Sequence, residues 1–290
     1  MMKIVLTGAS GQLGQEWQQW AETKQELILC PYTSSQLDIT DREQLSSELY
    51  EQQPDVVVNC AAYTDVDGAE EKKELAHRVN AEAVSQLAGL SSELGFKLVH
   101  YSTDYVFAGQ EEDRKKCPDG YPEDYPADPI NWYGQTKWEG EEAIRRAATD
   151  YLILRLSWVC GQFGSNFVKT MLRLGNERDE LQVVNDQWGS PTYTENIVAN
   201  SWQLLKKSSS GTFHITSKGR ITWYDFAEAI FELNDIDLKV ESVTSDAFPT
   251  KAERPHFSKL STQKLESVPG AHITEWKAGL ERLLNQLRNR

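Results

Sequence analysis

Tyr133 and Lys137 are the two residues of this sequence whose types and spacing could carry acid–base chemistry. They stand four residues apart near the start of an expected helix, 131–148, so both side chains lie on one helix face. An ammonium group beside a phenol favours the phenolate and lowers the pKa of the tyrosine. A phenol tuned in this way could give a proton to a carbonyl oxygen or take one from an alcohol. The same spacing is common on helix surfaces, so the assignment depends on where the helix lies.

The helix follows an expected strand, 97–102, whose end supplies hydroxyl groups. The strand runs into Ser102, Thr103 and Asp104. Because alternate strand residues face opposite sides, we expect only one of Ser102 and Thr103 to aim its hydroxyl into the site. That hydroxyl would hydrogen-bond the reacting oxygen of a substrate. The five histidines show no metal-ligand spacing, and the sequence assigns them no role.

A glycine-rich turn near the start of the chain predicts a nucleotide site. Gly8, Gly11 and Gly14 follow an expected strand, 3–7, and open an expected helix, 12–23. Such glycines permit a tight turn, and backbone N–H groups at a helix N-terminus can approach a pyrophosphate. The spacing G-x-x-G-x-x-G differs from the dinucleotide pattern G-x-G-x-x-G. A purely conformational turn is the alternative.

The choice between the two nicotinamide cofactors is left open by the residues after the second expected strand, 27–29. An acid there would bind the 2′-hydroxyl of NADH, and an arginine would accept the 2′-phosphate of NADPH. Residues 30–35 contain neither, and the missing acid slightly favours NADPH. The hydroxyls of residues 33–35 could bind a phosphate or simply form a polar loop. Asp38 and Ile39 could contact the adenine, or Asp38 could only form a turn.

The elements that must position these residues alternate between strand and helix in the first half of the chain. Further strands are expected at 55–58 and 151–156, and further helices at 42–52 and 69–94. Alternation of this kind, with strands apolar on both faces, predicts an α/β fold with a doubly wound parallel Rossmann sheet. We expect residues 1–157 to form the NAD(P)-binding domain.

The second half mixes the two kinds of element and predicts a smaller C-terminal α/β substrate domain, mainly residues 158–290. Parts of 195–216 could return to the first domain. Helices are expected at 166–174, 195–206, 223–233 and 275–287, and strands at 181–184, 212–215 and 238–243.

Composition excludes several classes of protein. The chain has 290 residues, with 30 Lys+Arg against 44 Asp+Glu and a net charge of −14, which argues against a nucleic-acid partner. Residues 250–290 nevertheless carry a surplus of basic residues. No apolar run is long enough to span a membrane. The four cysteines are far apart, as expected in a reducing compartment. We expect a cytoplasmic protein.

Taken together, these motifs resemble the extended short-chain dehydrogenase/reductase family, and within it the dTDP-4-dehydrorhamnose reductases. The resemblance spans the chain in order, through residues 11–14, 61–67, 102–107, 133–137, 155–159, 166–172, 186–192, 222–226 and 254–256. It implies hydride transfer from NADPH or NADH to the C4 carbonyl of dTDP-4-dehydro-β-L-rhamnose, giving dTDP-L-rhamnose. It leaves open whether the chain forms a homodimer.

The resemblance also implies roles for particular residues. The catalytic residues would be Thr103, Tyr133 and Lys137. The cofactor contacts, together with the glycine turn, would be Gly8, Gly11, Gln12, Leu13, Asp38, Ile39, Ala62, Tyr63, Thr64, Tyr133 and Lys137. The substrate contacts would be Thr103, Asp104, Tyr105 and Trp158. Trp158 could instead be an ordinary core residue.

Two further residues could meet the charge of the substrate. Asn166 begins a helix whose N-terminus suits an anionic diphosphate, although it could be only an N-cap. Arg254 lies in the basic C-terminal stretch and would supply a cation for the same diphosphate, with an exposed ion pair as the alternative. We expect no metal. Glu16 and Glu195 match acids through which some family members bind magnesium, but the matching C-terminal acid is missing.

Two alternatives to this function remain at this level. One is a reductase or epimerase acting on another nucleotide sugar. The other is a non-catalytic, NADP-binding regulatory subunit, which would be expected to have a damaged catalytic trio.

Overall fold

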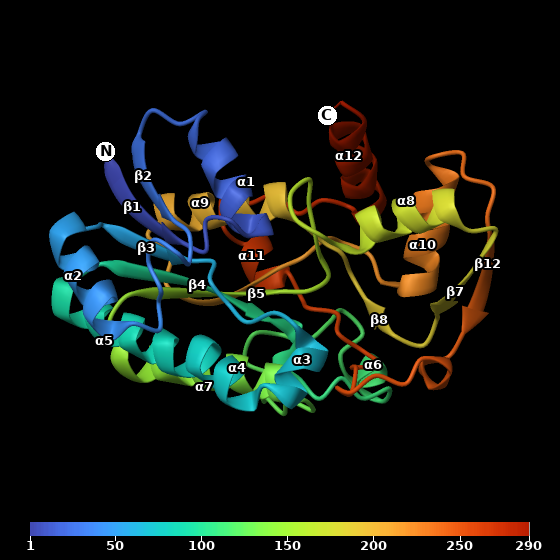
Figure 1. The fold of residues 1–290 in the computed structure, drawn as a ribbon, viewed down its shortest axis with the longest axis horizontal. Coiled ribbons are helices and arrows are strands. Elements are labelled where there is room, and N and C mark those ends of the chain that lie inside the picture. Colours follow the sequence, from blue (N-terminus) through green and yellow to red (C-terminus); the bar gives the residue numbers. More distant parts are fainter. Residues whose placement is uncertain (290) are drawn as a thin grey trace.

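A six-stranded parallel sheet forms the larger part of the molecule in this computed structural model, which describes residues 1–289. The sheet confirms the predicted α/β fold (Figure 1). Its order is β2 (Leu27–Tyr32), β1 (Met2–Thr7), β3 (Val56–Asn59), β4 (Lys97–Thr103), β5 (Tyr151–Leu156) and β10 (Gly211–Ile215). The central strands are apolar on both faces, and every residue of β3 is buried. Arg290, the last residue of the expected second domain, lies outside the described residues.

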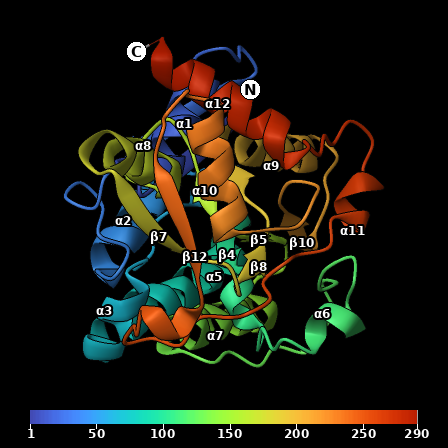
Figure 2. The same ribbon diagram turned by 90° about the vertical axis from the view of Figure 1, so that its right-hand side faces the viewer.

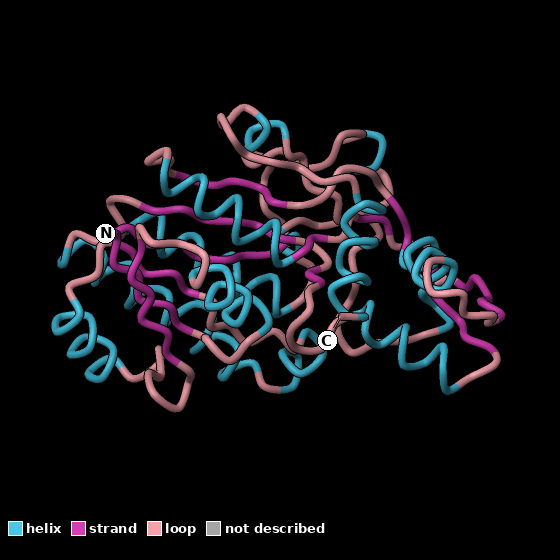
Figure 3. The backbone as a smooth tube through the Cα atoms, turned by 90° about the horizontal axis from the view of Figure 1, so that it is seen from above, coloured by secondary structure: helices cyan, strands magenta, loops and turns pink. Residues whose placement is uncertain are grey.

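Helices cover both faces of this sheet, which is the doubly wound arrangement (Figures 1 and 3). One face packs against α1 (Gln12–Ala21) and α9 (Thr194–Lys206), which bury Trp17 and Ile197 in a common core. The other face packs against α2 (Arg42–Gln52), α5 (Ala83–Leu94) and α7 (Trp132–Ala147). The catalytic candidates on α7 are therefore held against the sheet by a packed helix.

Two expectations for this part need correction. Strand β2 continues through Pro31 to Tyr32, three residues beyond the expected end. Proline is tolerated because β2 lies at the sheet edge, where its missing N–H leaves no neighbour unpaired.

The single helix expected at 69–94 is instead four segments: α3 (Val66–Glu71), α4 (Lys73–His77), a π-helical turn (Arg78–Glu82) and α5. It starts earlier because Asp65 caps α3, and it breaks at Lys72, whose backbone leaves the helical region (φ −111°, ψ 50°).

A smaller layered region closes one end of the molecule (Figure 2). It contains α8 (Phe167–Glu177), α10 (Trp223–Glu232), α12 (Trp276–Arg288) and the parallel pair β7 (Glu180–Val184) and β12 (Lys239–Val243). These elements share a core of their own around Phe226 and Leu280. Strand β10 pairs with β5, and α9 packs on α1, so residues 194–215 lie with the larger sheet.

Several short elements were not expected from the sequence, because two-residue strands and single turns carry no periodic pattern. They are the paired strands β6 (Val159–Cys160) and β9 (Thr192–Tyr193), the paired strands β8 (Trp188–Gly189) and β11 (Ile221–Thr222), the helices α6 (Asp113–Lys116) and α11 (Gln263–Glu266), and the 3₁₀ turns Asp104–Val106 and Ser245–Ala247. In the described chain, every helix is too short or too polar to cross a bilayer.

Candidate active site

The glycine turn lies where the order of the strands changes direction, at β1, whose neighbours are β2 and β3. Ligands of doubly wound sheets bind outside the strand ends at such a point. Gly8 has a left-handed backbone (φ 68°), and a Cβ added to it would lie 2.6 Å from the backbone nitrogen of Ala61. Only glycine fits there. The loop after β3 consequently lies directly against the turn that leads into α1.

Two cavities open along this edge of the sheet. The first, about 490 Å³, is lined by the ends of β4 and α7, and the second, about 320 Å³, by the loop after β2. Both are lined by Gly11, Cys60, Ala61 and Ala62, so they adjoin. The residues expected to contact the cofactor all line one cavity or the other: Gly8, Gly11, Gln12, Leu13, Asp38, Ile39, Ala62, Tyr63, Thr64, Tyr133 and Lys137. We call these two adjoining cavities the cradle, and contacts of its residues with a dinucleotide stay a prediction.

At the far end of the cradle, the polar loop divides its side chains. Ser34 lines the smaller cavity, whereas the Thr33 and Ser35 hydroxyls lie 3.0 Å apart and hydrogen-bond one another. Asp38 lines the cavity and also forms a turn, because its Oδ1 accepts from the backbone N–H and the hydroxyl of Thr40, both at 2.9 Å. Asp38 therefore forms the turn, and an adenine contact by it stays a prediction.

Tyr133 lies partly buried at the opposite end of the cradle, with its ring in an edge contact with Tyr105. Burial raises the pKa of its phenol to about 12, while a hydrogen bond with the Thr103 hydroxyl acts to lower it and the Asp104 carboxylate to raise it. Lys137 was expected to lower this pKa, but it is not among the groups that shift the pKa in the protein alone.

The amino group of Lys137 lies behind the tyrosine, against β4. Its Nζ donates to the carbonyl oxygen of Tyr101 at 2.7 Å and lies 3.1 Å from Nε2 of His100. Burial lowers the pKa of Lys137 to about 8, against an opposing pull from the Glu141 carboxylate. No role was expected for His100. Its position in the sequence could have indicated one, because His100 and Ser102, two apart on β4, face Lys137 and Glu141, four apart on α7.

Ser102 and Thr103 separate as strand alternation predicts. The Ser102 hydroxyl donates to Glu141 at 2.5 Å. Glu141 also accepts from Arg155 on β5, at 2.8 and 2.9 Å, and both side chains are fully buried. The Thr103 hydroxyl is the one that hydrogen-bonds Tyr133. This buried network fixes α7 to the strand that carries Thr103.

Asp104 and Trp158 complete the wall of the larger cradle cavity. The Asp104 carboxylate accepts from the Thr103 hydroxyl at 2.9 Å, and burial raises the pKa of Asp104 to about 7. Trp158 adopts a left-handed backbone (φ 46°), which is rare for a tryptophan. Its ring stacks on Trp223 with centroids 3.6 Å apart. Trp158 therefore lines the cavity and also packs against the core of the smaller region.

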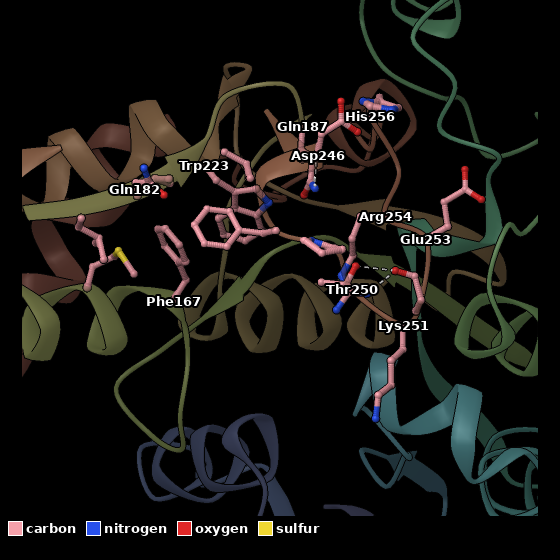
Figure 4. A pocket seen from close by; sticks show the side chains of 18 of the residues that line it. Phe167, Gln182, Gln187, Trp223, Asp246, Thr250, Lys251, Glu253, Arg254 and His256 are labelled. Atoms are coloured by element: carbon pink, nitrogen blue, oxygen red, sulfur yellow. Dashed lines mark hydrogen bonds between the residues drawn. The ribbon is translucent and has the colours of Figure 1, made fainter. Parts of the chain in front are cut away.

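A third and larger cavity, about 810 Å³, lies between β7, α8 and residues 245–256 (Figure 4). Phe167 and Trp223 point into it from one side, and Arg254 and Thr250 lie towards the other. It adjoins the cradle, because Tyr105 lines both and the Trp158–Trp223 stack joins a residue of each. This cavity was not expected from the sequence, because its walls come from distant segments.

The two residues expected to bind the substrate diphosphate lie in different places. Arg254 lines the larger cavity, with its guanidinium on Asp67. Asn166 caps α8, and its amide donates to Gln12 and to the Gly161 carbonyl, both at 2.8 Å. Asn166 thus holds a residue of the cradle, and a substrate contact by it stays a prediction. Within residues 1–289, no three His, Cys, Asp or Glu side chains gather as a metal site.

Comparisons with known proteins agree with this geometry. Residues 2–289 match the family model described as the RmlD substrate binding domain. The chain is 38% identical to the dTDP-4-dehydrorhamnose reductase of Escherichia coli K12, over 99% of this chain and 98% of that protein. A dTDP-4-dehydrorhamnose reductase structure from Clostridium acetobutylicum superposes with a TM-score of 0.94 at 40% identity, covering 99% and 100% of the two chains. That from Bacillus anthracis, in complex with NADP, gives 0.93 at 38% identity, with 99% and 100% covered.

Proposed function

Because the chain belongs to the RmlD substrate binding domain family, we propose that it is a dTDP-4-dehydrorhamnose reductase that uses NADPH or NADH. The observation that carries the proposal is the meeting of Thr103, Tyr133 and Lys137 in one cavity at the end of a dinucleotide cradle. Under this proposal, residues 1–157 with 194–215 bind the cofactor. The smaller region binds most of the nucleotide sugar.

The reaction adds a hydride and a proton across the C4 carbonyl of the sugar. When bound, the reduced nicotinamide supplies the hydride that the carbonyl carbon accepts. Tyr133 gives its phenolic proton to the carbonyl oxygen, so the product is an alcohol and the residue is left as phenolate. Thr103 hydrogen-bonds the phenol and orients it towards the carbonyl oxygen. The positive charge of Lys137 stabilises the phenolate that forms.

The sugar would lie where the cradle cavity of about 490 Å³ meets the cavity of about 810 Å³. Thr103, Asp104 and Tyr105 lie on the cradle side of it, and Tyr105 also lines the larger cavity. The nucleotide would then occupy the larger cavity, with the base against Phe167 and Trp223 and the diphosphate towards Arg254. Flat aromatic faces suit a pyrimidine, and a guanidinium suits a diphosphate.

We propose NADPH as the preferred cofactor. No acid follows β2, where it would select a free ribose hydroxyl, and Ser34 offers a hydroxyl to a phosphate. The Bacillus anthracis relative, solved with NADP, supports this choice. A homodimer stays a prediction of the family resemblance, and size-exclusion chromatography with light scattering would test it.

The intact catalytic trio disfavours the regulatory-subunit alternative. The decisive experiment follows the loss of reduced nicotinamide absorbance when the purified protein meets dTDP-4-dehydrorhamnose with NADPH or with NADH. We expect turnover with NADPH to be the more efficient. Oxidation with neither cofactor, in a protein that still binds NADPH, would contradict the proposed activity. The UDP-linked 4-keto sugar serves as the control for the nucleotide.

A further inference from the structure

Lys137 is backed by a line of buried side chains that the proposed chemistry does not use. His100 on β4 lies 3.1 Å from the lysine through Nε2, and its Nδ1 lies 3.1 Å from Nδ2 of Asn59 on β3. Asn59 and His100 are at most 1% exposed, as is Lys137. No water can reorganise around such groups to relieve a mismatch, so each donor must meet an acceptor.

The orientation of the Asn59 amide is fixed by its other contacts. Its Oδ1 accepts from the backbone N–H of Ala61 at 3.1 Å and from the Thr7 hydroxyl at 2.7 Å. A backbone N–H can only donate, so the oxygen of the amide must face Ala61. The NH₂ group of Asn59 therefore points at His100.

This orientation selects one tautomer of His100. Nδ1 receives a hydrogen from Asn59, so it must be the unprotonated nitrogen of the ring. Burial and the Lys137 charge hold the pKa of His100 well below its usual range, so the ring is neutral and has a single N–H. That hydrogen is on Nε2 and points at Lys137.

The two protonation states of Lys137 meet this hydrogen differently. An amine has a lone pair, so it can accept from Nε2–H while one of its own hydrogens goes to the Tyr101 carbonyl. An ammonium has no lone pair and would set donor against donor. Moving the histidine proton to Nδ1 would only transfer the conflict to the Asn59 NH₂ group.

We propose that Asn59 and His100 are positioning residues that penalise the ammonium form of Lys137 by presenting it with a hydrogen-bond donor. The consequence for the reaction is that Lys137 gives up a proton readily. Once Tyr133 has donated to the substrate, loss of a proton from Lys137 towards the phenolate leaves an amine, the form that His100 Nε2–H binds. A solvent proton then restores the ammonium.

Other groups facing Lys137 act alongside this pair. Burial is the largest cause of the fall in the pKa of Lys137 to about 8, and Glu141, one turn along α7, opposes it. Asp104, at the end of β4, lines the same cavity, and burial raises its pKa to about 7. Cys60, in the loop after β3, also lines it, and its raised pKa keeps it a neutral thiol. Of these titratable groups, His100 is the one whose side chain contacts the amino group directly.

The first test observes the tautomer by NMR of the imidazole nitrogens in the whole protein, with the His100 signals assigned by their loss in His100→Gln. We expect a neutral ring carrying its hydrogen on Nε2 between pH 6 and pH 8. A ring protonated on Nδ1 would overturn the proposal. This measurement needs neither substrate nor turnover, so its result stands apart from the proposed activity on which the kinetic test rests.

The second test replaces the hydrogen-bond donor that His100 presents to Lys137 with an acceptor. In Asn59→Asp, one carboxylate oxygen keeps Ala61 and Thr7, and the other accepts from His100 Nδ1, which frees Nε2 to accept from an ammonium. His100→Gln can offer its carbonyl oxygen directly. Each should raise the pKa of Lys137, so the fall of kcat at alkaline pH should move upward by about one pH unit.

His214→Gln is the matched control for the loss of a buried histidine. His214 is also fully buried on a strand of the same sheet, but its ring faces Arg155 rather than Lys137. It should leave the alkaline limb in place. An alkaline fall of kcat that stays at the same pH in both folded test variants would refute the proposal. Where kcat is too low to measure, ¹³C NMR of labelled lysine follows the same titration, with the Lys137 signal assigned by its loss in Lys137→Met.

Discussion

Arg254 and Asp67 form a two-pronged ion pair, with Nη2 to Oδ2 at 2.6 Å and Nη1 to Oδ1 at 3.1 Å. The pair joins α3, beside the cofactor cradle, to the segment that lines the larger cavity. The guanidinium hydrogen bond holds the pKa of Asp67 below its usual range, so the pair is charged at neutral pH. Arg254 is therefore held in place before substrate binds, although its charge is already balanced.

The Arg254 charge gives the first prediction. Arg254→Ala should raise the KM for the dTDP-sugar severalfold or more and leave the Kd for NADPH unchanged, because the guanidinium faces the substrate cavity. Steady-state kinetics and cofactor titration measure the two constants. Lys251→Ala is the control, since that lysine also lines the cavity but is 60% exposed and paired with Glu71. An unchanged KM in Arg254→Ala would remove Arg254 from the substrate site.

The phenol of Tyr133 gives the second prediction. Tyr133→Phe should reduce kcat by roughly 10²–10⁴-fold, because the proton donor is lost while the ring and its contact with Tyr105 are kept. Cofactor affinity, followed by fluorescence titration, should stay near that of the wild type. Tyr105→Phe keeps the same ring pair and should retain most of kcat. A fully active Tyr133→Phe would refute the assignment of Tyr133 as proton donor.

Most of the fold followed from the sequence because buried parallel strands and amphipathic helices carry strong periodic patterns. The strands at Lys97–Thr103 and Tyr151–Leu156 lie within one residue of their expected ends. Elements of two to four residues were missed, as was the break at Lys72, because long-range contacts rather than local pattern decide them. The end of β2 was expected too early, before Pro31, since only the sheet order shows that β2 is an edge strand.

The candidate site was predictable wherever one motif holds its members together. Tyr133 and Lys137 share a helix, and the glycine turn is continuous in sequence. The environment of Lys137 was not predictable, because His100 and Asn59 come from separate strands whose register sets their contact. The walls of the larger cavity were missed for the same reason. Trp223 and Arg254 are brought together only by the packing of the smaller region.

The buried pair of Glu141 and Arg155 gives a third prediction, about stability. Glu141→Gln should lower the free energy of unfolding by about 3–5 kcal/mol, because Arg155 would keep a buried charge without its partner. Urea unfolding measures the change. Glu142→Gln is the control: its carboxylate is 31% exposed and pairs with surface arginines, so the expected loss is below about 1 kcal/mol. Equal losses in the two variants would mean that the buried ion pair stabilises the fold no more than the exposed one does.

The raised pKa of Asp104 gives the last prediction, about how stability depends on pH. The carboxyl group is 3% exposed, and burial raises its pKa from 3.8 to about 7 in the folded protein. The folded state thus binds the proton more tightly than the unfolded chain does. The stabilisation from this proton is complete below pH 3.8 and is lost as the pH rises towards 7.

Asp104→Asn keeps the shape of the protonated acid at every pH, so it should not show this loss. The free energy of unfolding of the variant minus that of the wild type should increase by up to about 4 kcal/mol from pH 4 to pH 7 and then level off. Urea unfolding at intervals of pH measures the difference, in which the other titrating groups cancel. A constant offset between the two proteins would place Asp104 outside the groups that bind a proton on folding. A difference that grows as the pH falls would mean that the folded site prefers the carboxylate.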